Sequence, residues 1–234
     1  MRLLSFNIHG CIGRRGIADP DAILRVIEEA DADVVALQEV HDESRTDRSF
    51  LRALETRLAY PSVIYGPTMR KDEADYGNVL LSRIPPLSHE RIDLSQPGRE
   101  PRGGIRIRFA FQSRDFEITA THLGLAPRER RAQIERLALR DSTTPKPGTV
   151  RILMGDLNEW LPAGRANRML QQQFGPARII PTFPARFPLF ALDRIHVHPP
   201  GVRVTRRALK SKRARSASDH LPLVADLDFG PGLT

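Results

Sequence analysis

Short apolar runs alternate along the chain with amphipathic segments, and this alternation is the strongest constraint on the fold. Runs of four to eight apolar residues bounded by glycine, proline or charged residues are typical of buried strands. They predict strands at residues 3–8, 33–40, 79–82, 105–111, 116–121, 150–154, 195–197, 202–205 and 223–229. So many strands with few helices between them favour two packed sheets covered by helices.

Three segments carry apolar residues at helical spacing. Asp19 followed by Pro20 is typical of a helix start, because aspartate caps the first turn and proline suits the first helical position. Further helices are predicted around residues 50–58 and 128–140. Residues 176–190 contain four prolines and are predicted to form a loop.

The length of 234 residues predicts a single domain over residues 1–234. Cys11 is the only cysteine, which excludes an intrachain disulfide and a cysteine-based zinc site. The net charge of +8 favours anionic partners such as nucleic acid, phosphate esters or acidic lipid surfaces. No signal-peptide pattern or long apolar run is present, so we expect a cytoplasmic monomer without a transmembrane segment.

Polar side chains of catalytic types recur at or just beyond the ends of the predicted strands. They are Asn7, Gln38, Glu39, Asn78, His122, Asp156, Asn158, Asp193, Asp219 and His220. Each alone is more typical of a turn, but together they indicate one site on a rim of the sheets. Their carboxylate and amide oxygens suit Mg²⁺ or Mn²⁺, and the added histidines suit phosphoester hydrolysis.

Short motifs around these residues resemble, in order, those of the endonuclease/exonuclease/phosphatase superfamily. They are Asn7-Ile8-His9, Gln38-Glu39, Gly77-Asn78, Thr121-His122-Leu123, Gly155-Asp156-Leu157-Asn158, Leu192-Asp193-Arg194-Ile195 and Ser218-Asp219-His220. The resemblance spans residues 3–229. It implies an α/β fold, a four-layer sandwich in which two mixed sheets pack face to face between helices.

The resemblance also implies roles for the oxygen-bearing residues. Glu39 resembles the principal ligand of Mg²⁺ or Mn²⁺, assisted by Asn7 and Asp219. Asp156 resembles the carboxylate that orients or deprotonates the attacking water. Asn158 resembles the amide that holds the scissile phosphate.

The histidines are informative about the branch. His220 and Asp193 resemble the family's histidine–carboxylate pair, and whether Asp156 or His220 is the general base stays open. Abasic-site endonucleases usually carry aspartate where this chain has His9 and tyrosine where it has His122. The presence of a second catalytic histidine instead resembles the deoxyribonuclease, sphingomyelinase and inositol phosphatase branches. The chain as a whole resembles compact bacterial members of the superfamily.

The substrate is predicted less directly. The acid-free basic run at 203–215, with Arg206 and Arg207, is interpreted as a track for phosphates or as a solvated loop. Asn78 and Arg102 are further candidates for contact with a substrate phosphate. We expect a divalent-metal-dependent phosphodiesterase, most simply a nuclease acting on nucleic acid.

Three alternatives stay open at this point. A sphingomyelinase-like phosphodiesterase of lipid headgroups would use the apolar residues of segment 183–190 to touch a membrane. A phosphatase of a small phosphorylated metabolite is the second. The third is a non-catalytic binding module, which the complete set of catalytic residues disfavours.

Overall fold

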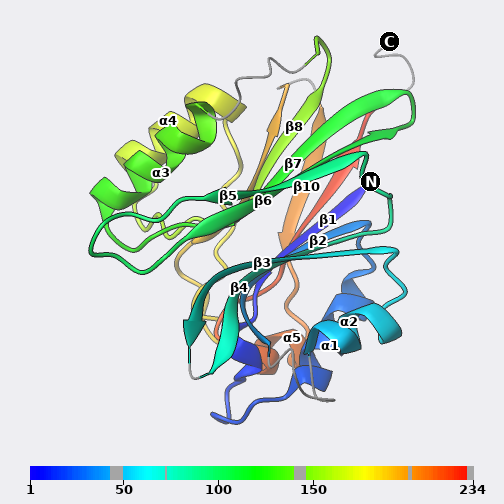
Figure 1. The fold of residues 1–234 in the computed structure, drawn as a ribbon, viewed down its shortest axis with the longest axis vertical. Coiled ribbons are helices and arrows are strands. Elements are labelled where there is room, and N and C mark those ends of the chain that lie inside the picture. Colours follow the sequence, from blue (N-terminus) through cyan, green and yellow to red (C-terminus); the bar gives the residue numbers. More distant parts are fainter. Residues whose placement is uncertain (43–49, 72, 140–145, 200–201, 231–234) are drawn as a thin grey trace.

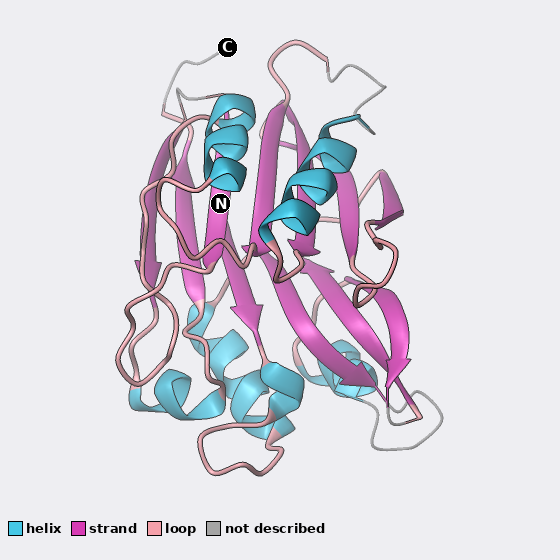
Figure 2. Cartoon of the chain, turned by 90° about the vertical axis from the view of Figure 1, so that its left-hand side faces the viewer, coloured by secondary structure: helices cyan, strands magenta, loops and turns pink. Residues whose placement is uncertain are grey.

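Two β-sheets pack face to face between two layers of helices (Figures 1 and 2). The computed structural model describes residues 1–42, 50–71, 73–139, 146–199 and 202–230. One sheet has six strands in the order β10-β11-β1-β2-β4-β3, and the other has five in the order β5-β6-β7-β8-β9. Both sheets are mixed, because β1–β2 and β7–β8 are parallel while the other pairs are antiparallel. The predicted four-layer α/β sandwich is therefore confirmed.

The strands cover most of the predicted apolar runs. Those of the six-stranded sheet are β1 (Arg2–Asn7), β2 (Val34–Asp42), β3 (Ser62–Lys71), β4 (Ala74–Ser82), β10 (Arg203–Ala208) and β11 (Leu223–Asp228). Those of the five-stranded sheet are β5 (Ser88–Asp93), β6 (Gly103–Phe111), β7 (Arg114–His122), β8 (Val150–Asp156) and β9 (Asp193–His198).

The helices lie on the outer faces of the two sheets (Figure 1). The six-stranded sheet is covered by α1 (Pro20–Ala30), α2 (Phe50–Arg57) and α5 (Lys212–Ala217), and the five-stranded sheet by α3 (Pro127–Leu139) and α4 (Arg165–Phe174). A short 3₁₀ turn, η1 (His9–Cys11), follows β1. The predicted start of α1 is confirmed, since Asp19 Oδ1 accepts a hydrogen bond from Ala22 N at 2.9 Å.

The central strands are apolar on both faces because each face meets another layer. In β1 and β11, Leu3 and Leu223 belong to the core between the sheets, whereas Leu4 and Val224 pack under α1. Strands buried on both faces read as continuous apolar runs rather than as alternating patterns. This explains why the sequence revealed the central strands most clearly.

Two strands and two helices were not predicted, β3, β5, α4 and α5, and neither was the 3₁₀ turn η1. The strands β3 and β5 are edge strands: β3 has only a short apolar run, at residues 63–65, before polar residues, and β5 is mostly polar and exposed. The helices α4 and α5 are rich in arginine, glutamine or lysine. Residues 176–190 contain no helix or strand, as predicted, and the described helices include none long and apolar enough to cross a membrane.

Candidate active site

The register of three neighbouring strands places three of the candidate residues in one row. His122 at the end of β7 pairs with Asp156 at the end of β8, and Asp156 pairs with Asp193 at the start of β9. The close approach of β7 and β8 here requires Gly155, since a Cβ at this position would lie 1.8 Å from Thr121 O. All three side chains are buried.

The six-stranded sheet contributes a second row of candidate residues, which lies beside the first row. Asn7 ends β1 and pairs with Gln38 of β2. Glu39 follows in a bulge of β2 and has a φ of 58°, a left-handed conformation that glutamate rarely adopts. Such backbone strain is concentrated at functional sites, because the surrounding structure must be built to hold it.

The two rows meet at Asp156. The side-chain nitrogen of Asn7 donates to Glu39 Oε1 at 2.9 Å and to Asp156 Oδ2 at 3.0 Å, so one amide bridges two carboxylates from different sheets. The other oxygen, Asp156 Oδ1, accepts from Asn158 N at 2.9 Å. Asn158 itself has a φ of 49°, which asparagine tolerates better than most residues.

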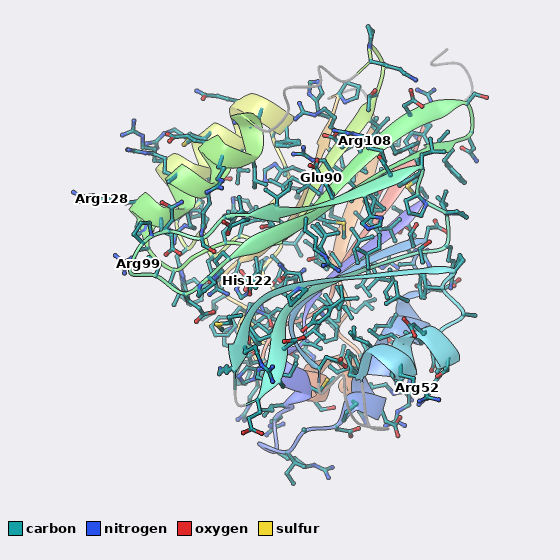
Figure 3. The ribbon with its side chains drawn as sticks, viewed as in Figure 1. Arg52, Glu90, Arg99, Arg108, His122 and Arg128 are labelled. Atoms are coloured by element: carbon teal, nitrogen blue, oxygen red, sulfur yellow. The ribbon has the colours of Figure 1, made fainter. Side chains whose placement is uncertain are left out.

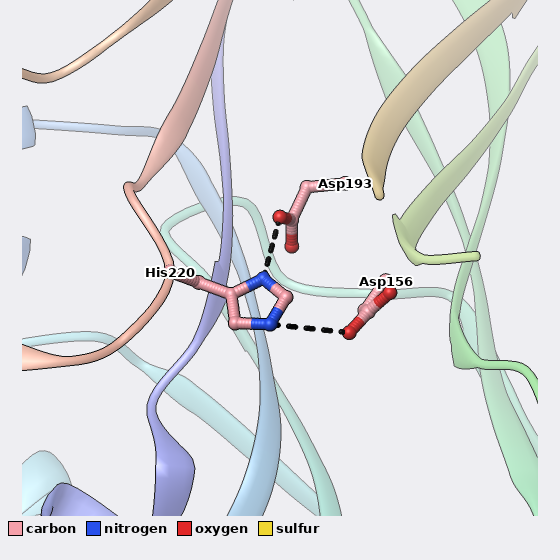
Figure 4. Close-up of side chains that lie close together, drawn as sticks. All are labelled: Asp156, Asp193 and His220. Atoms are coloured by element: carbon pink, nitrogen blue, oxygen red, sulfur yellow. Dashed lines mark hydrogen bonds and ion pairs between the residues drawn. The ribbon is translucent and has the colours of Figure 1, made fainter. Parts of the chain in front are cut away.

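On one side of Asp156 lies a group that we call the His220 arm, made of Thr182, Asp193 and His220. Figure 4 shows Asp193 and His220 beside Asp156. His220 Nδ1 lies 2.8 Å from Asp193 Oδ2, and Nε2 lies 3.7 Å from Asp156 Oδ2. Thr182 Oγ1 donates to the same Asp193 oxygen at 2.6 Å. The ring therefore stands between two carboxylates.

Burial alone would lower the pKa of His220. The charge and hydrogen bond of Asp193, with the charges of Asp156 and Asp219, outweigh burial and raise the pKa to about 10. His220 is therefore an imidazolium at neutral pH.

On the other side of Asp156 lies the His122 arm, made of Arg102, His122 and Asn158. Arg102 Nη1 lies 3.1 Å from His122 Nδ1, while His122 Nε2 lies 3.1 Å from Asn158 Nδ2 and 3.6 Å from Asp156 Oδ2. Figure 3 shows His122 in the interior, whereas the labelled Arg99 and Arg128 project outwards.

The His122 ring is held neutral by its surroundings. Burial and the charge of Arg102 lower the pKa of His122 to about 3, against a smaller opposing effect of Asp156. Both ring nitrogens face nitrogen atoms of donor groups, which disfavours a second ring proton.

A buried ionic network lies behind both arms. Arg194, which follows Asp193, donates to Glu159 O at 3.0 Å. Arg130 donates to Leu125 O at 2.6 Å and lies 3.5 Å from Glu159 Oε2. These contacts join the segment that follows β7, which ends at His122, to the segment that follows β8 and carries Asn158.

The structure does not join every candidate to this site. Asn78 lies inside β4 rather than before it, opposite the bulge of β2, and donates to Gly103 O at 3.0 Å. Asp219 contacts His9, with 3.8 Å between Asp219 Oδ1 and His9 Nδ1. Arg206 donates to Ile195 O at 2.8 Å, and Arg207 donates to Asp226 Oδ2 at 2.6 Å. Each arginine has a partner within the fold, and their contact with substrate phosphates stays a prediction.

Two contacts of the site had no signal in the sequence. Thr182 lies in a loop without any motif, so its bond to Asp193 could not be foreseen. Arg102 was considered for a phosphate, but its guanidinium contacts His122 and also Glu100 at 3.0 Å. Only the packing of β6 beside β7 brings Arg102 to the histidine.

Two groups of residues suit a metal ion. Glu39 and Asn7 have hydrogen-bonded side chains and offer oxygen ligands, which fits Mg²⁺ or Mn²⁺, although Asn7 Oδ1 accepts from His9 N. The third predicted ligand, Asp219, contacts His9 instead. Asp156, Asp193 and His220 form a buried group whose ligand atoms lie within 4.8 Å of one another and could also hold an ion. In that group, however, His220 Nδ1 already contacts Asp193.

Unpartnered polar atoms near Glu39 also fit a bound ion. Among the described residues, both amide atoms of Gln38 and Oδ1 of Asn78 are buried without a hydrogen-bond partner. Buried polar atoms are normally satisfied, and the two oxygens among these, Gln38 Oε1 and Asn78 Oδ1, could accept from water held by an ion, whereas the Gln38 nitrogen is a donor. The residues around Glu39 therefore fit a hydrated divalent cation.

Comparison with known proteins identifies the family. The chain belongs to the endonuclease/exonuclease/phosphatase family, whose model matches residues 4–220. Members of this family are hydrolases that act on phosphoesters. The uncharacterized protein YbhP of Escherichia coli strain K12 is 32% identical over 251 aligned residues, which cover 97% of this chain and 95% of YbhP.

Solved structures agree with this assignment. An endonuclease/exonuclease/phosphatase from Beutenbergia cavernae superposes with a TM-score of 0.78 at 25% identity, covering 98% of this chain and 72% of that chain. A mannosyl-6-phosphatase from Bacteroides thetaiotaomicron superposes with a TM-score of 0.76 at 18% identity, covering 98% of this chain and 100% of that chain. The second likeness, at its lower identity, concerns the fold alone.

Proposed function

We propose that the protein is a divalent-metal-dependent phosphodiesterase. The observation that carries this proposal is the position of Asp156, whose Oδ2 lies 3.0 Å from Asn7 Nδ2, 3.6 Å from His122 Nε2 and 3.7 Å from His220 Nε2. A buried carboxylate with two histidines and an amide around it is suited to activate water beside a phosphoryl group.

Glu39, assisted by Asn7 and Asp219, would hold Mg²⁺ or Mn²⁺. When bound, such an ion neutralises charge on the phosphoryl oxygens. The unpartnered oxygens Gln38 Oε1 and Asn78 Oδ1 support the placement of a hydrated ion here.

The protein's own groups divide the proton transfers between them. His220 has a pKa raised to about 10, so it is charged at neutral pH and fits an acid that protonates the leaving oxygen. That leaves Asp156 as the group that accepts a proton from the attacking water. Asn158, on the opposite side of Asp156, would hold the scissile phosphate through its amide.

A diester fits this charge distribution better than a monoester. Glu39 and Asp156 place carboxylates at the site, and any negative charge that the metal ion leaves uncompensated would repel a monoester, which carries a second negative charge near neutral pH, more than a diester. The nuclease interpretation is supported by the net charge of +8. Arg206 and Arg207 add little to it, since both guanidinium groups engage partners within the fold.

A specific observation favours a second substrate class, a phosphodiester in a lipid headgroup. Large apolar side chains, among them Phe187, Leu189 and Trp160, stay exposed beside the His220 arm. Nucleic acid offers no aliphatic surface to such a group, whereas a lipid surface does.

Hydrolysis of bis-nitrophenyl phosphate, compared with the nitrophenyl monoester, tests the proposal. We expect turnover of the diester that is lost after metal removal with EDTA and restored by Mg²⁺ or Mn²⁺. Glu39→Gln should raise the metal concentration needed for half-maximal activity, because it removes the formal charge facing the ion. Full activity in metal-free protein, or a preference for the monoester, would contradict the proposal.

A further inference from the structure

Five large apolar side chains gather on two loops next to the His220 arm. We call this group the apolar rim; its members are Trp160, Leu161, Phe187, Leu189 and Phe190. The two loops touch, because the Trp160 ring lies 4.9 Å from the Phe190 ring and 5.9 Å from the Phe183 ring. Phe183 in turn lies 4.8 Å from the His220 ring, so the rim adjoins the proposed catalytic groups directly.

The rim faces solvent to an unusual degree. Leu189 is 72% exposed, and Phe187 and Leu161 are each 66% exposed. Among the described residues, the rim holds half of the large hydrophobic side chains that are exposed. Single exposed apolar residues are ordinary, but a cluster of them marks a contact surface.

The loop that carries the rim is firmly built. Thr182 N and Phe183 N both donate to Phe190 O, at 2.9 and 3.0 Å, and Leu189 N donates to Phe183 O at 2.9 Å. Ala185 N donates to Asp219 O at 2.7 Å, which anchors the loop to the site. The apolar side chains are thus held outward by a hydrogen-bonded scaffold.

The surroundings of the rim are cationic. Between Glu159, which is buried beside Arg130, and Asp219, which adjoins the loop at the site, Asp193 is the only acidic residue, and it is buried against His220. The guanidinium of Arg186 lies 5.1 Å from the centre of the Phe187 ring. Arg215 of α5 donates to Ala185 O at 3.0 Å and to Arg186 O at 3.1 Å, which joins this basic helix to the loop.

We propose that the apolar rim docks the protein on an anionic phospholipid surface. Exposed aliphatic and aromatic side chains ringed by cations are the combination that binds such surfaces, through apolar burial together with attraction to anionic headgroups. Nucleic acid would call for exposed aromatic faces, yet two of the three most exposed members are leucines. Docking would bring lipid phosphodiesters to Asp156 and His220, and this part of the inference rests on the proposed function.

Vesicle binding tests the docking independently of catalysis. Full-length protein would be sedimented with phosphatidylglycerol vesicles and with phosphatidylcholine vesicles. We expect tighter binding to phosphatidylglycerol, weakened by salt because the attraction is partly electrostatic. The double variant Phe187→Ser/Leu189→Ser should bind at least about tenfold more weakly, since two apolar side chains no longer enter the surface.

A matched control is Leu87→Ser. Leu87 is 77% exposed but lies between β4 and β5, where Ser82 pairs with Val34 at the start of β2, the end opposite to Glu39. This variant should bind vesicles like the unaltered protein. All of these proteins should hydrolyse bis-nitrophenyl phosphate equally, because the substituted residues lie outside the catalytic groups.

Several outcomes would overturn the docking proposal: no binding of the unaltered protein to phosphatidylglycerol vesicles, unchanged binding by the double variant, or an equal loss in Leu87→Ser. Loss of oligonucleotide binding in the double variant, without any vesicle binding, would assign the rim to nucleic acid instead. Vesicle binding by a protein that hydrolyses no diester would refute the proposed function and leave the docking intact.

Discussion

The His220 arm and the His122 arm use the same residue type on two sides of Asp156 and treat it in opposite ways. Both rings are buried, and burial alone would lower the pKa of each. His220 faces Asp193 and is charged, whereas His122 faces Arg102 and is neutral. At His220 the carboxylate of Asp193 therefore overrides burial, whereas at His122 burial and the charge of Arg102 lower the pKa together.

This difference separates two tasks within one site. A charged imidazole donates a proton or stabilises negative charge, whereas a neutral imidazole buried beside Arg102 offers hydrogen bonds of fixed geometry. The two arms also differ in origin. Asp193 of β9 and His220, which precedes β11, link the two sheets, whereas Arg102 directly precedes β6 and His122 ends the neighbouring strand β7 of the same sheet.

The largest expected effect comes from breaking the His220 arm. Asp193→Asn should keep the fold but lower kcat by roughly 10³- to 10⁴-fold, because the imidazole loses its orienting carboxylate. His220→Ala should cost a similar factor, and the double variant should lose little more, since the two residues act as a unit. Steady-state kinetics with the small diester measures this, and multiplicative losses would show that the two residues work separately.

Breaking the His122 arm should cost less. Arg102→Gln keeps a donor near His122 Nδ1 but removes the charge, so the pKa of His122 should rise above about 3 while burial keeps it below its usual range. We expect roughly a 10- to 100-fold loss in kcat/KM, as for other residues that orient a catalytic group. The histidine NMR signal followed through pH measures the pKa.

The matched control for this variant is Arg99→Gln, which alters an exposed arginine three residues earlier. It should leave both the His122 signal and the kinetics unchanged. An unmoved His122 pKa in Arg102→Gln would mean that burial alone sets the protonation state of His122.

The pH dependence of stability sharpens the comparison. Because folding raises the pKa of His220 from 6.5 to about 10, the stability gained from its charge is fully present below pH 6.5 and disappears as the pH rises through 10. Near pH 6, Asp193→Asn should therefore lower the free energy of unfolding by a few kcal/mol, on the order of the cost of breaking a buried ion pair. Denaturant titrations at several pH values measure this, and a difference that grows towards pH 10 would reverse the assigned sign.

The smallest effect is expected outside both arms. Arg207 pairs with Asp226 on the surface, where both side chains are more than a third exposed. Arg207→Ala should therefore change the free energy of unfolding by about 0–1 kcal/mol and leave hydrolysis of the small diester unchanged. A large kinetic loss in this variant would restore Arg207 to the substrate-binding residues.

Much of the site could be predicted because its residues follow strands. Asn7, His122 and Asp156 end strands whose apolar runs are plain in the sequence, and strands of one sheet deliver their ends to a common rim. The family motifs pointed to the same positions, and the matched family agrees with them. Two of the four edge strands, β3 and β5, and the polar helices α4 and α5 were missed, since polar or charged side chains interrupt their apolar patterns.

The sequence alone determined which residue types are available, because a buried strand and a catalytic motif are both local patterns. The tertiary structure decided which of them meet: that His220 contacts Asp193 while His122 contacts Arg102, and that Arg206 and Arg207 are engaged within the fold. It also decided that Trp160, Phe187 and Leu189 stay outside the core. These are contacts between segments far apart in the chain, and the sign of a neighbouring charge or the burial of a side chain exists only once those segments are packed together.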